Sequence, residues 1–201
     1  MSSLLHQRAS FYKGIVSAKD IPGDLPEVTF WGRSNVGKSS LINTILNQKK
    51  LVRVSNTPGR TREINYFNIG DNFYITDLPG YGYAVVSHTE KKLWSKLIFD
   101  YLEQSTQLKR VYLLIDARRS MMDIDFKVAN YLDSIGISYQ ITVTKIDKLK
   151  SSELLSLKNT LEEQVKPLIA VFPEILYCSS AKKDISSLHK SISHLILQSM
   201  S

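Results

Sequence analysis

The segment from Gly32 to Ser39 constrains this chain more than any other part of its sequence. It reads Gly-Arg-Ser-Asn-Val-Gly-Lys-Ser and matches the pattern G-x-x-x-x-G-K-[ST] at every fixed position. A β-prone run, Val28 to Trp31, comes directly before it, and apolar residues at helical spacing, Leu41 to Leu46, follow it. A strand, a glycine-rich turn and a helix in this order bind phosphate, because backbone N–H groups and the positive end of the helix point at phosphate oxygens. The segment therefore predicts a P-loop in which Lys38 contacts phosphates and Ser39 ligates Mg²⁺.

The rest of the chain alternates between β-prone runs and helical patterns. Strands are expected at 64–69, 73–76, 111–115, 137–143 and 174–178, and helices at about 90–104, 123–134, 151–165 and 184–199. The turn Gly70-Asp71 joins the first two of these strands as a hairpin. The alternation predicts one α/β domain over residues 1–201 with a short N-terminal extension. Its sheet is expected to be mostly parallel and six-stranded, with one antiparallel strand and helices on both faces.

Composition narrows the setting in which such a chain works. The 201 residues include one cysteine, Cys178, which excludes an internal disulfide and favours a reducing compartment. No apolar run is long enough to span a bilayer, and we expect a cytoplasmic monomer without membrane contact. The net charge of +7 is typical of a protein that binds a polyanion such as RNA, or of a soluble protein with a positive surface. The first 19 residues carry Arg8, Lys13 and Lys19 and no acid, as in a mitochondrial transit peptide, but lack the arginine density of such a peptide.

Two segments beyond the P-loop have the residue types needed around Mg²⁺ and a terminal phosphate. Asp77-Leu78-Pro79-Gly80 ends the strand after the hairpin, where a carboxylate can hold Mg²⁺ through a water. The backbone N–H of Gly80 is then expected to approach the γ-phosphate. Either of two threonines in the preceding loop, Thr57 or Thr61, can complete the Mg²⁺ shell when that phosphate is present.

Two later segments predict a guanine site. Thr144-Lys145-Ile146-Asp147 follows the strand at 137–143, and the carboxylate of Asp147 can accept hydrogen bonds from guanine N1–H and the 2-amino group. Adenine lacks both donors, and sites of this kind can discriminate by ~10⁴ or more. The stem of Lys145 can lie along the base, and a backbone N–H of Ser179-Ser180-Ala181 can meet guanine O6.

These motifs resemble the EngB family, also called YihA or YsxC, within the TrmE–Era–EngA–EngB–Septin class of GTPases. The likeness runs from about Phe11 to the final helix and is most distinctive at residues 32–43, 57–61 and 77–84. It implies a slow GTPase that assists assembly of the large ribosomal subunit, with links to septation, the cell cycle and cell division. It also favours Thr61 over Thr57 and makes the stretch from Phe11 to Ala18 part of the fold.

The residues expected to bind GTP or GDP come from the five motifs. They are Gly32, Arg33, Ser34, Asn35, Val36, Gly37, Lys38, Ser39, Ser40, Gly59, Arg60, Thr61, Asp77, Leu78, Pro79, Gly80, Thr144, Lys145, Ile146, Asp147, Ser179, Ser180 and Ala181. Lys38, Thr61 and Gly80 are expected to act in hydrolysis, and Ser39, Thr61 and Asp77 to hold the metal, Asp77 through water.

Two residues, Thr144 and Tyr81, depart from the general GTPase pattern, and Asn35 offers a further way in which hydrolysis could be assisted. Thr144 stands where many GTPases have asparagine, which predicts a weaker contact to the P-loop or base. Tyr81 stands where signalling GTPases have the glutamine that positions water, so hydrolysis is expected to be very slow or to need another group or a partner. Asn35 is either a site for K⁺, as in related GTPases, or a plain polar loop residue.

Three alternatives to a ribosome-assembly GTPase remain open. The first is an interaction protein whose binding depends on the nucleotide and whose hydrolysis is negligible. The second is a GTPase with another target, and the third is a P-loop ATPase or small-molecule kinase. Asp147 argues against the last, because that carboxylate would be unpaired against adenine. If the partner is the large subunit or its RNA, Arg60, Arg62, Lys91 and Lys92 are the expected contacts near the nucleotide.

Overall fold

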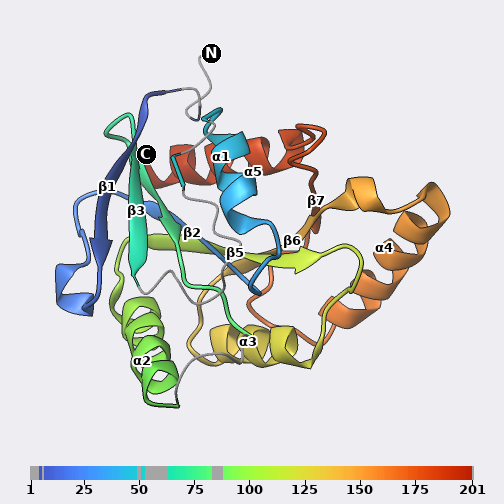
Figure 1. Cartoon of the computed structure of the whole chain (residues 1–201), viewed down its shortest axis with the longest axis horizontal. Helices are drawn as coiled ribbons and strands as arrows, with labels where there is room; N and C mark the ends of the chain where they lie inside the picture. The colour runs from blue at the N-terminus through green and yellow to red at the C-terminus, as the bar shows by residue number, and fades with distance from the viewer. Residues whose placement is uncertain (1–4, 6, 49–50, 53–62, 83–87, 201) are drawn as a thin grey trace.

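The computed structural model describes residues 5, 7–48, 51–52, 63–82 and 88–200. Its helices lie on both faces of one sheet, α1 and α5 on one side and α2 and α3 on the other (Figure 1). The strands are β1 (Ala9–Ile15), β2 (Glu27–Gly32), β3 (Ile64–Ile69), β4 (Phe73–Asp77), β5 (Leu108–Asp116), β6 (Tyr139–Thr144) and β7 (Leu176–Tyr177). The helices are α1 (Lys38–Ile45), α2 (His88–Gln104), α3 (Asp123–Ser134), α4 (Ser151–Val165) and α5 (Ser186–Met200), with short 3-10 turns η2 (Ala18–Asp20) and η3 (Ile146–Lys148).

The sheet has the strand order β1-β3-β4-β2-β5-β6-β7. The pairs β4–β2, β2–β5, β5–β6 and β6–β7 are parallel, whereas β3 is antiparallel to both of its neighbours. The expected parallel α/β sheet with one antiparallel strand is therefore confirmed. The expected number of strands was wrong by one, because β1 adds an edge strand. A shift of register between Phe11 and Lys13 interrupts the alternation by which a strand is recognised in a sequence.

Two hydrophobic cores fill the space on either side of the sheet. On one face, apolar residues of α1 and α5, among them Leu41, Ile42, Leu188 and Ile192, pack on Phe30 and its neighbours. The other face is covered by the apolar sides of α2, α3 and α4. Burial of both faces explains why β2 and β5 read as nearly continuous apolar runs. Because β2, β4 and β6 run in the same direction, their carboxyl ends lie at one edge of the sheet, where parallel α/β sheets bind ligands.

Among the described residues, no helix has the length and apolar character needed to cross a membrane.

Candidate nucleotide-binding site

The P-loop has the backbone that its sequence predicts. β2 ends at Gly32 and α1 begins at Lys38. Gly37 caps this helix with a φ of 102°, a left-handed conformation that side chains rarely adopt, and no side chain caps the first turn. The first N–H groups of a helix have no acceptor within it, so this turn offers donors and a positive dipole end to an anion.

The segment after β4 lies directly against the P-loop. The Ser34 amide donates to the Tyr81 carbonyl at 3.1 Å, and the Tyr81 amide donates to the Gly32 carbonyl at 3.2 Å. A Cβ on Gly80 would lie 3.1 Å from the Ser34 amide nitrogen, a tighter contact than most side chains make, so glycine favours this close approach. Gly80 is thus fixed beside the loop that is expected to hold phosphates.

Lys38 and Asp77 bring opposite charges together at the centre of the site. The Lys38 ammonium forms an ion pair with the Asp77 carboxylate, and both side chains are largely buried. Ser39 is the next residue of α1 and is partly buried. Hydroxyl and carboxylate oxygens are suitable ligands for Mg²⁺, which in nucleotide sites is bound by few protein groups together with phosphates. Among the described residues, no group of three or more histidine, cysteine or acidic side chains could hold a metal ion. The Ser39 hydroxyl and the Asp77 carboxylate are oxygen donors of the kind that Mg²⁺ prefers.

The carboxylate of Asp147 is held in place at the end of β6. It accepts a hydrogen bond of 2.6 Å from the Ser179 hydroxyl, which in turn accepts from the Lys182 amide at 3.1 Å. The Lys148 ammonium lies 3.3 Å from the other carboxylate oxygen. The Ser179 hydrogen bond, helped by Lys148, lowers the pKa of Asp147 and keeps it ionised. The two predicted guanine motifs thus meet through Asp147 and Ser179.

Thr144 keeps a contact with the P-loop despite replacing asparagine. Its hydroxyl donates to the Val36 carbonyl at 2.7 Å and lies 3.3 Å from the Ile115 carbonyl. The expectation of a weaker contact therefore finds no support on the P-loop side. Lys145 makes a second link, because its ammonium donates to the Asn35 carbonyl at 2.6 Å. Its side chain also passes close to Gly37, where an added Cβ would lie 3.4 Å from Cε.

Asp116 is a residue of the site whose role sequence reasoning missed. At the end of β5 it accepts from Lys145 at 2.8 Å and from the Arg118 guanidinium at 2.7 and 2.9 Å. Burial acts to raise its pKa, but the hydrogen bonds from Arg118 and Lys145 outweigh burial and hold the pKa well below the ordinary value. Asp116 thereby fixes the lysine that reaches the P-loop. The segment Asp116-Ala117-Arg118-Arg119 stood out in the sequence, but nothing in it indicated this partner.

The side chain of Tyr81 is occupied elsewhere. Its hydroxyl donates to the Asp125 carboxylate of α3 at 2.7 Å, and its ring packs edge-on against Trp31 at 5.4 Å. Trp31 in turn donates from its indole nitrogen to the Pro79 carbonyl at 3.1 Å. These contacts anchor the turn after β4, and they direct the tyrosine hydroxyl to α3.

The remaining predicted residues fall into two groups. Ser40 lies in the first turn of α1, Leu78 is fully buried, Ile146 begins η3, and Ser180 and Ala181 follow β7. Thr57, Gly59, Arg60, Thr61 and Arg62 lie outside the described residues. Lys91 and Lys92 belong to α2 by sequence, and their side chains are likewise not described.

Comparisons with known proteins agree with this geometry. The family model described as "50S ribosome-binding GTPase" matches residues 27–145. A "Probable GTP-binding protein EngB" of Chelativorans sp. is 44% identical over 197 residues, covering 92% of this chain and 88% of the relative. A protein of the same name from Rhizobium meliloti is 46% identical over 182 residues, with 86% and 84% covered.

Solved structures extend the likeness to the fold. The crystal structure of a probable GTP-binding protein engB has a TM-score of 0.64 at 23% identity and covers 86% of this chain and 99% of its own. Era in complex with MgGDPNP and nucleotides 1506–1542 of 16S ribosomal RNA has a TM-score of 0.66 at 22% identity, covering 87% and 57%. The family match and the close relatives, together with a P-loop and guanine motifs in contact, show that this chain belongs to the EngB family of GTPases.

Proposed function

We propose that this GTPase is a slow molecular switch that assists assembly of the large ribosomal subunit in the cytoplasm. We also propose that residues 1–201 form a single GTPase domain with a short N-terminal extension. The observation that carries the nucleotide part is the carboxylate of Asp147 in η3, just after β6, which accepts a hydrogen bond of 2.6 Å from the Ser179 hydroxyl. A carboxylate fixed in this way pairs with the two donors of guanine. Any link to septation or cell division would follow from that ribosomal role.

The residues around Lys38 divide the work on the phosphates and metal. Lys38 neutralises the β- and γ-phosphates, and the N–H groups at the start of α1 cradle them. Ser39 and Thr61 would hold Mg²⁺ and Asp77 would hold it through water, while Gly80 would offer its N–H to the γ-phosphate. The bound metal would neutralise negative charge on the phosphates. Loss of the γ-phosphate removes the contacts that Thr61 and the Gly80 N–H would make with it, and this change of contacts is the switch.

Slow turnover follows from the position of Tyr81. A group that orients the attacking water must face the γ-phosphate, and the Tyr81 hydroxyl instead donates to Asp125. We expect intrinsic rates of ~10⁻⁴–10⁻² s⁻¹, as in unassisted switch GTPases. Single-turnover hydrolysis with and without ribosomal particles separates this proposal from an interaction protein with negligible hydrolysis. No product in either condition would favour the interaction protein.

Asn35 is the residue to test for a monovalent cation. It lies at the exposed rim of the P-loop with a left-handed φ of 64°, and Lys145 binds its carbonyl oxygen. If its side chain helps to hold K⁺, replacing K⁺ by Na⁺ will lower the hydrolysis rate, and Asn35→Ala will remove the difference. A rate that is the same in both salts would leave Asn35 as a polar loop residue.

The positive net charge of the chain and its match to a family model both support a ribosomal partner. The chain carries +7, and the matched family model bears the description of a 50S ribosome-binding GTPase. The proposed contacts near the nucleotide are Arg60 and Arg62, before β3, and Lys91 and Lys92 in α2. Both regions flank the switch, so their order can couple nucleotide state to RNA binding.

Co-sedimentation with purified large subunits tests this proposal. More protein is expected to pellet with a non-hydrolysable GTP analogue than with GDP, and pelleting is expected to fall steeply with salt. Charge reversal at Arg60 and Lys92 is expected to weaken pelleting while GTP affinity stays nearly unchanged. Equal pelleting with both nucleotides would refute the switch, and no pelleting with any particle at low salt would refute the partner.

A further inference from the structure

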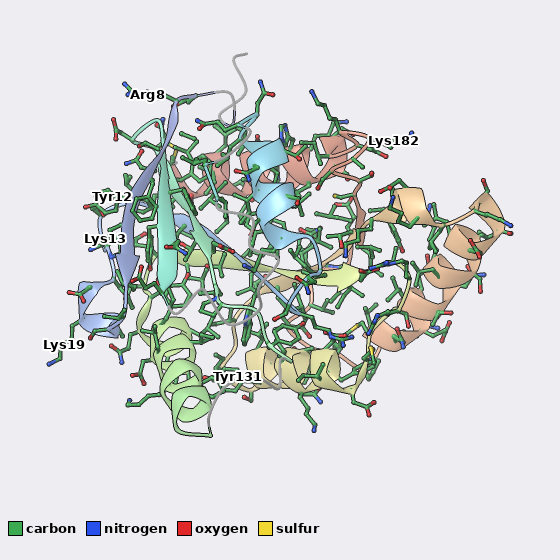
Figure 2. The ribbon with its side chains drawn as sticks, viewed as in Figure 1. Arg8, Tyr12, Lys13, Lys19, Tyr131 and Lys182 are labelled. Atoms are coloured by element: carbon green, nitrogen blue, oxygen red, sulfur yellow. The ribbon has the colours of Figure 1, made fainter. Side chains whose placement is uncertain are left out.

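The free edge of the sheet gathers aromatic and basic side chains that the nucleotide site does not use. Along β1, Phe11 is 53% exposed and Tyr12 48% exposed. Arg8 and Lys19, at the two ends of this strand and its following turn, are exposed, and Lys13 is half-buried between them. We call these five residues the β1 edge. Figure 2 shows four of them, Arg8, Tyr12, Lys13 and Lys19, spread along the same side of the molecule.

The two rings of the β1 edge are held in place by rings beneath them. Phe11 packs edge-on against Phe67, with 5.8 Å between the ring centroids. The ring centroids of Tyr12 and Tyr74 lie 5.2 Å apart, and the ring planes make an angle of 32°. Phe67 and Tyr74 belong to the two different cores, so Phe11 and Tyr12 rest on opposite faces of the sheet. Rings supported in this way are already oriented, so that little side-chain freedom is lost when a ligand stacks on them.

Protection of the sheet edge does not account for these residues. Proteins keep edge strands from pairing with other chains by placing lysines and bulges on them. Lys13 and the register shift between Phe11 and Lys13 already provide both devices. Two half-exposed rings work against that purpose, because they add apolar surface to a strand that has only one neighbouring strand among the described residues.

The charge of the β1 edge selects the class of partner. Residues 1–19 contain Arg8, Lys13 and Lys19 and no acid. Acids that lie close to this surface are Asp20 in η2, Asp24, whose carboxylate accepts from the Tyr74 hydroxyl at 3.3 Å, Glu63 next to Gly14, and Asp71, which follows the Gly70 amide that donates to the Arg8 carbonyl. Aromatic rings between cations are suited to unpaired nucleotides, whose bases stack while the phosphates meet lysine and arginine. A duplex keeps its base faces stacked inside the helix, so these rings could not stack on them.

We propose that the β1 edge binds an unpaired segment of RNA, with one base stacked on Tyr12, another on Phe11, and phosphates on Arg8, Lys13 and Lys19. The proposal rests on the proposed ribosomal function and locates a contact that is separate from the nucleotide site. Its position favours communication with the switch. Ile15 of β1 pairs with Ile64, two residues after the segment that contains Thr61, and η2 packs against α2.

Fluorescence anisotropy of the full-length, GDP-bound chain with a labelled oligouridylate tests the surface itself. Tyr12→Ala is expected to weaken binding about 5- to 100-fold, as loss of one stacked base does, and Tyr12→Leu to do the same although it keeps apolar bulk. Tyr12→Phe keeps the ring and is expected to bind nearly as the original chain does. Lys13→Gln is expected to reduce the salt slope by ~0.7, the value for one phosphate contact on a single strand.

Matched controls come from other parts of the surface. Phe172→Ala removes a ring that is 37% exposed. Phe172 follows Val171, which is bridged to Tyr139 of β6, at the end of the sheet opposite β1. Lys190→Gln removes an exposed charge on α5. Neither is expected to change oligouridylate binding. Thermal unfolding with GDP present checks that every variant is folded.

The same variants in co-sedimentation separate the possible results. Parallel losses at Tyr12 with oligouridylate and with large subunits support the proposal. Subunit binding that Tyr12→Ala leaves unchanged would overturn it and leave the ribosomal function standing. A loss on subunits without a loss on oligouridylate would also overturn it, because the occupant would then be a protein strand. If no particle binds the original chain, the ribosomal function fails, whereas the oligouridylate result still decides whether the β1 edge binds RNA.

Discussion

Replacing Asn43 by alanine is expected to destabilise this protein far more than its place on a helix suggests. Asn43 lies in α1, one turn after the proposed Mg²⁺ ligand, and is 7% exposed. Its amide nitrogen donates to the Val52 carbonyl at 2.8 Å, and its oxygen accepts from the Val52 amide at 2.8 Å. Val52 is 4% exposed, so the variant would leave two buried backbone groups without partners. At about 1–3 kcal/mol for each group, the loss comes to ~2–6 kcal/mol.

Equilibrium urea unfolding at a fixed GDP concentration measures this loss. Thr44→Ala is the matched control, because Thr44 is the next residue of the helix and its hydroxyl donates only to the Ser40 carbonyl among the described residues. The control is expected to change stability by no more than ~0.5 kcal/mol. If Asn43→Ala is no less stable than Thr44→Ala, the hydrogen bonds between Asn43 and Val52 do not contribute the expected stability.

The same substitution should also affect nucleotide preference. Val52 directly precedes the segment that contains Thr61, the proposed ligand that depends on the γ-phosphate. A loosened start to that segment is expected to weaken binding of a GTP analogue more than binding of GDP. Isothermal titration with the two nucleotides checks this, and equal losses would separate the anchor from the switch.

Four further outcomes test the site. Asp147→Asn is expected to shift preference from GTP to XTP, which presents an oxygen where guanine has its amino group; unchanged preference in a competition assay would refute the guanine contact. Lys38→Ala is expected to lose most nucleotide affinity, because a cationic partner of the phosphates is removed, and affinity near that of the original chain would refute this role. Ser39→Ala is expected to impair binding with Mg²⁺ more than Mg²⁺-free GDP binding, and equal losses would reject it as a ligand. The pKa of Asp116 is lowered, so its ionised form stabilises the fold at pH values above the ordinary aspartate pKa of 3.8, and this contribution fades as the pH falls below that value. The difference in stability between the original chain and Asp116→Asn should therefore be largest near neutral pH and shrink in acid. A difference that does not depend on pH would count against a role for the charge.

Most of the fold was predictable because its parts follow local rules. The helix from Asp123 to Ser134 and the strand from Ile64 to Ile69 have the bounds that periodicity and turn residues indicated. The P-loop was equally clear, since a glycine with positive φ at Gly37 is required before the helix begins. In each case the determining residues are neighbours in sequence.

The missed features depend on residues that are distant in sequence. β1 is a strand because β3 pairs with it about fifty residues later, and its own sequence around Tyr12 does not alternate. The role of Asp116 becomes visible only when β5 and β6 lie side by side and bring Lys145 within 2.8 Å. The absence of glutamine at Tyr81 was evident in the sequence, but its partner Asp125 on α3 was not.

The strand order also determines when the nucleotide site can exist during synthesis. β2, which leads into the P-loop, lies between β4 and β5, so it gains its second neighbour only after residue 116 has been made. The support for Asp147 comes later still, from Ser179. At ~5–20 residues per second, roughly 7 to 28 seconds separate Lys38 from Ser179 on the ribosome. The complete nucleotide site, with Ser179 bound to Asp147, therefore forms late in synthesis. The binding free energy of GDP or GTP, ~2.7 kcal/mol at a concentration one hundred times Kd, stabilises only chains long enough to contain Ser179.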